Sequence, residues 1–527
     1  MKYGFKIFIV FCLLGIVQAC TKKLDLFPTN DTTSATVFAT PTGYKQALAK
    51  LYAGMAVTGS PGRDIPAQIV SDEGNTGFLR QFWYLQCLST DEAGWTYSGN
   101  TDPVGIHQMT WSASTQAVAG AYYRSYYVIT LCNNFIAEST DEKLSGRGIS
   151  GTDADNIRKY KAEARFLRAF NYWVLMDLFG NIPFVDESYV IGSGKFPAQR
   201  GRAAVFSYIE SELKDMEAGL ADAKSNEYGR IDKAAAWSLL ARLYLNAQVY
   251  TGTARYTDAI TYAKRVIAAG YTIHPAYKEL MLADNHLNTD EFIWTIRYDG
   301  TNTQTYSGTT FLAHAPAGVA GDTSGTNGTW DCARLTEQFV DKFDAQDIRG
   351  QFWTTNQRKN MDTLLGNARS GYASSKFRNR TRSGAFGPNT DASKIFVDID
   401  MPVFRLAEIY LIYAEAVVRG GSGGDNATAL GYLKQLAQRA RPSDPNAANN
   451  PQMTLPYIID ERGRELFWEG FRRTDLIRFG QFTTGAYLWA WKGGVRNGTA
   501  VDAKYNLYPI PATDLSSNPN LVQNAGY

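Results

Sequence analysis

Histidine, cysteine and excess charge are all scarce in this 527-residue sequence. It has four histidines and five cysteines, and 53 lysines and arginines balance 51 aspartates and glutamates, which leaves a net charge of +2. This balance lacks the basic excess that nucleic-acid binding requires. The histidines show no metal-ligand spacing, which argues against a zinc hydrolase or histidine catalysis: His107, His274, His286 and His314. We expect no cofactor, and the sequence does not predict whether structural calcium is bound.

Long hydrophobic runs are also lacking, so no membrane-spanning helix is expected. The apolar run from Ile7 to Val17 follows a lysine-bearing start and is typical of a secretory signal peptide. It leads to Cys20 in a pattern that resembles a bacterial lipobox, although Gln18 stands where a small or hydroxyl residue is usual. We expect residues 1–19 to be removed and Cys20 to be acylated, which holds the protein to a membrane. The alternative is ordinary signal cleavage with Cys20 left free. The three further cysteines are too scattered for a disulfide framework or a zinc site: Cys87, Cys132 and Cys332.

Apolar residues recur at three- and four-residue spacing through much of the chain, which predicts amphipathic helices. The pattern covers residues 44–55, 123–136, 157–179 and 205–220. Two further stretches, 236–268 and 406–440, resemble tetratricopeptide helix pairs, with small residues where two helices approach, although the helices of the first pair are spaced more widely than in the standard repeat. We therefore expect a mainly α protein in which tetratricopeptide-like helix pairs form a scaffold.

The chain divides into a tether and a folded body. Residues 20–40 are polar and suit a tether attached to lipid. The body is expected as an N-terminal part, 41–230, and a C-terminal part, 231–527, packed as one unit. Two regions rich in glycine, threonine and aromatic residues, 64–115 and 299–400, are predicted to be irregular. Loops this long inside a compact protein usually carry function, so we expect the ligand site there.

Several enzyme motifs match in letters but not in context. Gly146 to Gly151 fits a dinucleotide-binding pattern, but the preceding segment is polar and cannot be the buried strand required. Gly420 to Gly424 fits a nucleophile elbow, but it joins two predicted helices. A glycosidase needs only two carboxylates, and the acidic pairs at 72–73 and 91–92 are candidates. Such pairs more commonly form turns or helix caps, so a surface glycoside hydrolase is the lesser alternative.

Aromatic residues form 13% of the chain and gather beside polar side chains in the first irregular region. Arg80 follows Phe78, and the stretch GWTYSGN contains Trp95, Tyr97 and Asn100. A sugar ring packs its C–H face on an aromatic ring, and Arg or Asn can bond its hydroxyl groups. On an exposed loop this combination suits a sugar site, although the same rings could instead cover the core.

Longer motifs across nearly the whole mature chain resemble the SusD/RagB family. The most specific are AEARFLRA with DLFG, PVFRLAE, ELFWEGFRRTDLIRFG and YPIP, at residues 162–169 with 177–180, 402–408, 465–480 and 508–511. The resemblance implies a lipid-anchored glycan-binding protein without catalytic activity. It also implies an outer-membrane location facing the cell exterior and a TonB-dependent, SusC-like transporter as partner. The outward orientation comes from the family alone, since residues 21–25 carry no dense acidic export signal.

Within the family, the sequence is most similar to starch-binding members, through residues 72–74, 90–92, 241–252 and 487–499. This similarity implies capture of starch or maltooligosaccharides for import, with a different surface glycan as the alternative. It also implies an arc of aromatic rings completed by an arginine and an asparagine: Arg80, Trp95, Tyr97, Asn100, Tyr306 and Trp330. Tyr97 stands where a tryptophan is expected, which keeps a flat ring but reduces its area.

Overall fold

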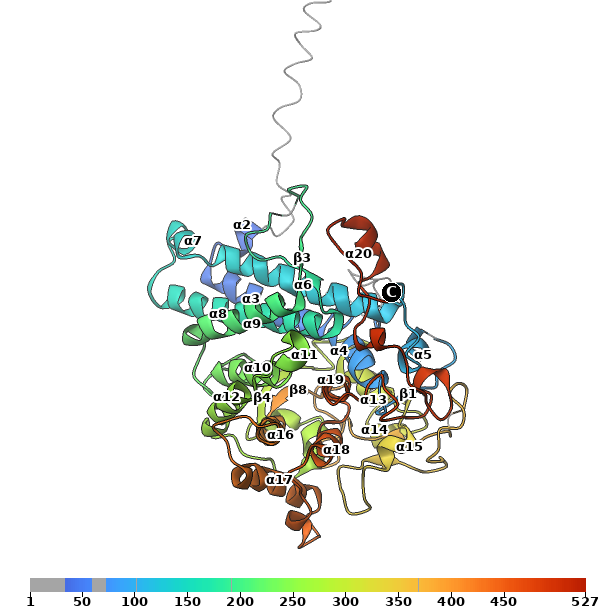
Figure 1. Cartoon of the computed structure of the whole chain (residues 1–527). Helices are drawn as coiled ribbons and strands as arrows, with labels where there is room; N and C mark the ends of the chain where they lie inside the picture. The colour runs from blue at the N-terminus through green and yellow to red at the C-terminus, as the bar shows by residue number, and fades with distance from the viewer. Residues whose placement is uncertain (1–33, 59–72, 101, 191, 368) are drawn as a thin grey trace, which may run out of the picture.

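The computed structural model describes residues 34–58, 73–100, 102–190, 192–367 and 369–527 (Figure 1). The predicted signal peptide, Cys20 and most of the predicted tether lie outside these residues. The last part of the predicted tether belongs to the folded body, because α2 (Ser34–Val37) is helical and Phe38 is buried. Within the described ranges, no helix combines the length and the apolar character that crossing a bilayer requires.

Long helices of the N-terminal part pack into one layer at the upper side of Figure 1. They are α3 (Pro41–Ala56), α6 (Gln116–Glu138), α8 (Gly151–Phe179) and α9 (Arg202–Asp215). Local signals fix where they begin and end. Thr40 caps α3 by accepting a hydrogen bond from the Gly43 N–H, with proline in the first turn. Gly180 ends α8 with a φ of 72°, which glycine adopts without the cost of a Cβ clash. The predicted helical periodicity is confirmed for this layer.

The two predicted tetratricopeptide-like pairs form one continuous stack. In the first, α10 (Lys233–Leu245) packs on α12 (Tyr256–Ala268), with α11 (Ala247–Thr251) between them in sequence. In the second, α16 (Leu406–Val418) packs on α17 (Asn426–Ala440), and α12 joins the pairs by packing on α16. Ala241 and Ala263 are fully buried at the close approaches. Helices α18 (Leu455–Leu466) and α19 (Arg472–Arg478) follow, and α18 packs on α16. The mainly α fold with tetratricopeptide-like pairs is therefore confirmed.

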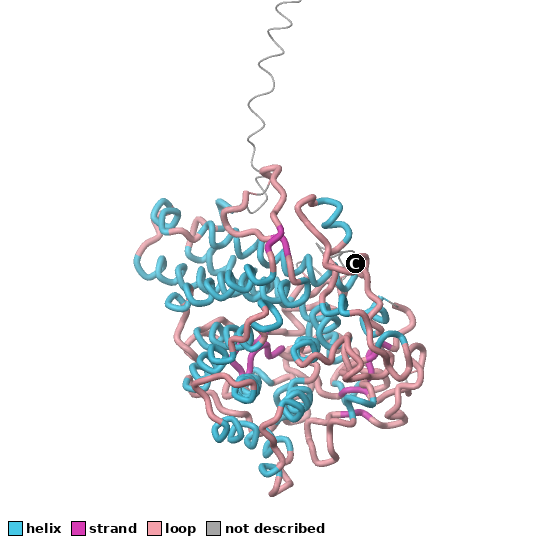
Figure 2. Tube along the Cα trace, in the orientation of Figure 1, coloured by secondary structure: helices cyan, strands magenta, loops and turns pink. Residues whose placement is uncertain are grey.

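Strands in the described residues are short and pair antiparallel in twos (Figure 2). The pairs are β1 (Gly94–Trp95) with β5 (Ala333–Arg334), β2 (Ile182–Pro183) with β3 (Gln199–Arg200), β4 (Phe292–Ile296) with β8 (Met401–Arg405), and β6 (Phe352–Trp353) with β7 (Ala373–Ser374). The β4–β8 pair has register shifts, and β8 leads directly into α16. The β1–β5 pair links the two regions that the sequence predicts to be irregular.

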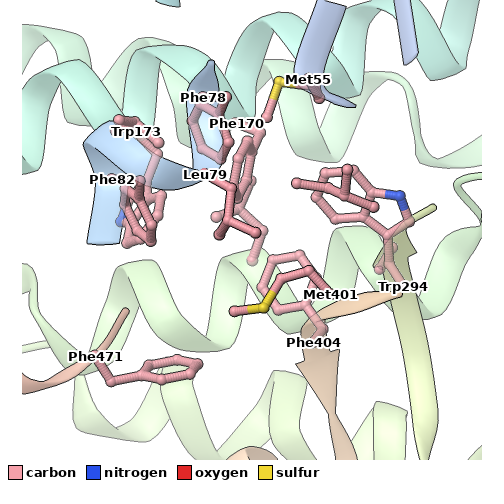
Figure 3. Close-up of a cluster of buried hydrophobic side chains, with 14 of the residues drawn as sticks. Met55, Phe78, Leu79, Phe82, Phe170, Trp173, Trp294, Met401, Phe404 and Phe471 are labelled. Carbon is pink, nitrogen blue, oxygen red and sulfur yellow. The ribbon is translucent and has the colours of Figure 1, made fainter. Parts of the chain in front are cut away.

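The first of those regions is more helical than predicted. It contains α4 (Phe78–Trp83), which runs into a π-helical turn (Tyr84–Leu88), and α5 (Asp102–His107). Phe78 and Leu79 are buried, so the expectation of an exposed loop at this point is wrong. The reason is packing: Figure 3 shows Phe78, Leu79 and Phe82 of α4 against Phe170 and Trp173 of α8.

The second region consists mostly of loop, as predicted, with three short helices: α13 (Gly308–His314), α14 (Gly321–Ser324) and α15 (Glu337–Val340). Shorter helical elements complete the described chain: α7 (Asp141–Gly146), α20 (Ala512–Ser517) and the single turns Glu217–Gly219, Tyr277–Met281, Asn285–Leu287, Ala447–Asn449, Lys492–Gly494 and Ala503–Asn506.

Candidate functional site

Arg80 is the centre of a cluster of aromatic rings. It lies half-buried on α4, where its Nε donates a hydrogen bond to Tyr84 Oη at 2.9 Å. Its guanidinium carbon lies 4.6 Å from the ring centroid of Phe311 and 6.0 Å from that of Trp330. Its Nη1 donates to the main-chain oxygen of Tyr306 at 3.4 Å. These contacts with rings and neutral oxygens position the cation without a carboxylate partner among the described residues, which suits hydrogen bonding to ligand hydroxyls.

Tyr306 and Trp330 form a tilted pair of half-buried rings beside Arg80. Their centroids are 6.2 Å apart at an interplanar angle of 52°. Trp330 stacks on His314, with centroids 4.5 Å apart and planes 11° apart. Burial lowers the pKa of His314, so this support is a neutral ring at physiological pH. The structure therefore brings together three of the residues carried over from starch-binding relatives, Arg80, Tyr306 and Trp330.

Glu73 holds the loop that carries Tyr306. Its Oε2 accepts a hydrogen bond from the Tyr306 N–H at 3.0 Å, and its Oε1 accepts from Thr305 Oγ1 at 2.6 Å. Thr58 Oγ1 donates to the same Oε1 at 3.1 Å. In the sequence, Glu73 is a candidate for catalysis, and nothing there indicates its positioning role. Its contacts join residues more than 200 positions apart, and no local pattern reveals such a pairing.

Pairing of β1 with β5 places the 94–100 stretch next to Trp330. The Thr96 N–H donates to the Cys332 oxygen and Thr96 Oγ1 to the Asp331 oxygen, each at 2.8 Å. Tyr97 is 46% exposed on this stretch, as expected for a ring that meets a ligand. Asn100 is half-buried, and its Oδ1 accepts from the Asp102 N–H at 3.2 Å.

Trp95 differs from the expectation of an open ring. It is 1% exposed, and its ring meets that of Tyr84 edge to face, with centroids 5.5 Å apart. Its Nε1 donates to the main-chain oxygens of Tyr97 at 3.1 Å and Asn100 at 2.7 Å. The loop thus satisfies the indole N–H internally, and these hydrogen bonds hold the main chain that carries Tyr97. Of the two alternatives that the sequence left open, an exposed ring or a ring that covers the core, the structure shows the second for Trp95, whose ring packs on Tyr84.

Comparisons with known proteins agree with this architecture. A family model described as "SusD family" matches residues 350–527, and one described as "Starch-binding associating with outer membrane" matches residues 67–245. The starch-binding protein SusD of Bacteroides thetaiotaomicron is 35% identical, over 100% of this chain and 99% of that protein. The chain belongs to the SusD family.

Solved structures that share the SusD-family fold include two surface glycan-binding proteins. Surface glycan-binding protein A from Bacteroides fluxus aligns with a TM-score of 0.71 at 21% identity, over 94% of this chain and 100% of that one. Surface glycan-binding protein A from Bacteroides thetaiotaomicron, in complex with laminarihexaose, aligns with a TM-score of 0.70 at 19% identity, over 92% and 99%. At these identities the likeness establishes the fold.

The acidic pair at 91–92, a candidate for hydrolysis in the sequence argument, is built into the core of this SusD-family protein. Asp91 receives two hydrogen bonds from Arg472, at 2.7 and 2.8 Å, and both side chains are buried. Glu92 is also buried and accepts from the Trp468 N–H at 3.0 Å, and burial raises its pKa to about 8. Neither carboxylate is open to a polysaccharide. Of the pair at 72–73, Asp72 lies outside the described residues.

No group of three or more His, Cys, Asp and Glu side chains is arranged to hold a metal ion in the part of the chain that the structure describes. The three cysteines expected to remain in the folded body are buried and unpaired: Cys87, Cys132 and Cys332. Burial raises the pKa of each thiol.

Proposed function

We propose that this protein binds starch or maltooligosaccharides at the cell surface and passes them to a TonB-dependent, SusC-like transporter. It is held to the outer membrane through acylated Cys20, needs no cofactor and catalyses no reaction. Two features support this proposal: full-length similarity to a starch-binding protein, and the cluster of Arg80, Tyr306 and Trp330 next to exposed Tyr97. The cluster is the observation that carries it, because sequence-distant segments supply rings and a cation at one place.

The tilt between the rings favours a curved ligand. Tyr306 and Trp330 lie 52° apart in plane, so a flat sugar ribbon cannot stack on both at once. A curved α-glucan can present successive sugar faces to rings at such an angle, while Arg80 and Asn100 offer hydrogen-bonding groups to the hydroxyl rim. Tyr97 extends this surface on the β1 side.

Titration calorimetry of the mature chain, begun after Cys20, tests the proposal. Maltoheptaose and the cyclic α-glucan are expected to bind, and cellohexaose, a flat chain of similar length, is expected not to bind. Binding of cellohexaose with equal affinity, or silence with both curved glucans, would contradict the assignment to starch.

A different surface glycan is the second candidate, and the burial of Trp95 favours it. With Trp95 buried, the open platform has one ring fewer than the sequence predicts, which reduces the stacking area available to an α-glucan. The same titration with laminarihexaose separates the two candidates.

Incubation with amylose and an assay for reducing ends tests hydrolysis, where product above a heat-killed control would refute the binding-only function.

A further inference from the structure

A cavity lined by α6 and by none of the residues of the Arg80 cluster is called the tyrosine groove here. It is bounded by α6, by the connection between β2 and β3, and by α20, which lie together in the upper part of Figure 1. Its lining includes Tyr123 and Tyr126 from α6, Tyr189 and Phe196 from the connection, and Asp514 from α20. Its volume of about 680 Å³ is within the range of roughly 300–1,000 Å³ usual for small-molecule sites. It shares no lining residue with the Arg80 cluster.

The aromatic rings of the groove are held in fixed positions by their own hydroxyl groups. Tyr126 Oη donates to the Pro183 oxygen at 2.6 Å, and Tyr189 Oη donates to the Lys195 oxygen at 2.6 Å. Tyr123 Oη pairs with Thr513 Oγ1 at 2.5 Å, which ties α6 to the start of α20. Rings fixed in this way lose little freedom when a ligand stacks on them. Phe196 adds an apolar ring that is 52% exposed and lines the groove, so its face is open to a ligand.

The groove offers no lysine or arginine side chain to an anionic ligand. Its charged lining residues are Asp186, Glu187 and Asp514; Glu187 is paired with Arg168 behind the groove, and Asp514 accepts a hydrogen bond from Tyr122. Asn134, an exposed amide on α6, lines the groove and makes no side-chain hydrogen bond to the described residues, so it is free to bond a ligand hydroxyl. Aromatic faces, acceptor oxygens and a free amide together match an uncharged molecule with many hydroxyl groups.

We infer that the tyrosine groove is a second binding site, for a neutral oligosaccharide. The ligand class rests on the proposed glycan-binding function, whereas the site itself stands on residues that the Arg80 cluster does not use. Two separate sites would hold one polysaccharide chain at two points, which raises overall avidity without tight binding at either.

The test is titration calorimetry of the mature chain with maltoheptaose and laminarihexaose, with an oligogalacturonate as the anionic control. Four proteins are compared: the native chain, Y306A/W330A, Y189A/F196A, and L287A as a control at an apolar position 58% exposed outside both sites. Tyr189 and Phe196 lie on a surface connection, so their removal should leave the melting temperature near the native value. We expect Y306A/W330A to retain a weaker binding event and Y189A/F196A to weaken that event, by roughly two- to tenfold for each lost ring.

Each outcome separates the groove from the Arg80 cluster. A Y189A/F196A titration that matches the native one, while Y306A/W330A loses all binding, would overturn the groove and leave the proposed function standing. If Y189A/F196A binds the glycan more weakly than the native chain and Y306A/W330A binds it equally well, the groove is the binding site and the Arg80 cluster is not. Absence of binding to either neutral glycan in all four proteins, or tighter binding of the oligogalacturonate, would overturn the groove assignment.

Discussion

Trp330 contacts His314 on one ring face and lies beside two further residues of the candidate site, Tyr306 and Arg80. His314 stacks against it and is itself anchored, because its Nε2 lies 2.9 Å from the Ile395 oxygen. The ring centroid of Tyr306 lies 6.2 Å from that of Trp330, and the guanidinium carbon of Arg80 lies 6.0 Å from the Trp330 centroid. Trp330 is thus in contact with the ring of His314 beneath it and lies beside the Arg80 guanidinium of the site.

Replacing Trp330 by alanine should weaken α-glucan binding by about tenfold or more. One aromatic contact contributes about 0.5–1.5 kcal/mol beyond the area it buries, and the apolar area of the indole is lost as well. Calorimetry of W330A measures the change, and W237A, which removes a half-buried tryptophan from α10, is the matched control. Equal loss of affinity in both variants would show that the effect is general destabilisation.

Glu73→Gln should lower glycan affinity while the fold remains. The carboxylate accepts from both Thr305 and the Tyr306 N–H, whereas the glutamine amide has a single acceptor oxygen and its nitrogen would face a donor. A hydrogen bond to a charged group contributes about 1.5–3 kcal/mol, so a fall in affinity of about tenfold is expected when the loop loosens. Titration measures the glycan affinity of this variant and melting curves measure its stability, with E142Q, a substitution at an exposed glutamate, as the control. Unchanged affinity at a lower melting temperature would mean that Glu73 is structural only.

At the scale of elements, the helix pairs are joined by a buried ion pair. Arg242 of α10 makes two hydrogen bonds of 2.7 Å to the carboxylate of Glu408 on α16. The guanidinium also lies over aromatic rings, 4.2 Å from the centroid of Phe404. Because the pair crosses from one predicted repeat to the other, it fixes how the two pairs stack.

Arg242→Met should destabilise the protein by about 3–5 kcal/mol, because it leaves the buried Glu408 carboxylate without its partner. The double variant R242M/E408L should recover most of this loss, since apolar side chains then replace both charges. Urea unfolding of the single and double variants measures the difference. If the double variant is as unstable as R242M, the unpaired charge is not the cause. R158M, which removes an exposed arginine, is the control and should change little.

At the scale of the whole molecule, buried charges set opposite limits on stability at low and high pH. Burial opposes the ionisation of Glu461, but Arg349 and Arg464 outweigh it and lower its pKa to about 2. The stability that ionised Glu461 contributes is fully present above its pKa in the unfolded chain, near 4.5, and is lost as pH falls towards 2. Burial raises the pKa of Glu92 to about 8 and that of Asp400 to about 6. The stability that these two protonated carboxyl groups contribute is fully present below their pKa values in the unfolded chain. It is lost as pH rises through their pKa values in the folded protein.

The melting temperature should therefore be highest in mildly acidic solution and fall on both sides. Scanning calorimetry between pH 2.5 and 9 measures the profile. Glu92→Gln removes one of the groups that titrate on the alkaline side and keeps an acceptor oxygen, so the fall between about pH 5 and 8 should become shallower. A variant whose profile is parallel to the native one over that range would show that Glu92 does not titrate there.

The sequence by itself determined the mainly α fold, the helix pairs and the family, because helical periodicity and long motifs are local in the chain. It also named the residues of the candidate site, among which the structure gathers Arg80, Tyr306 and Trp330. Only the tertiary structure decided which rings are open. Trp95 and Tyr97 lie two residues apart in one loop, yet one is 1% and the other 46% exposed. Exposure and the positioning role of Glu73 depend on contacts between distant segments, and such contacts leave no pattern in the nearby sequence.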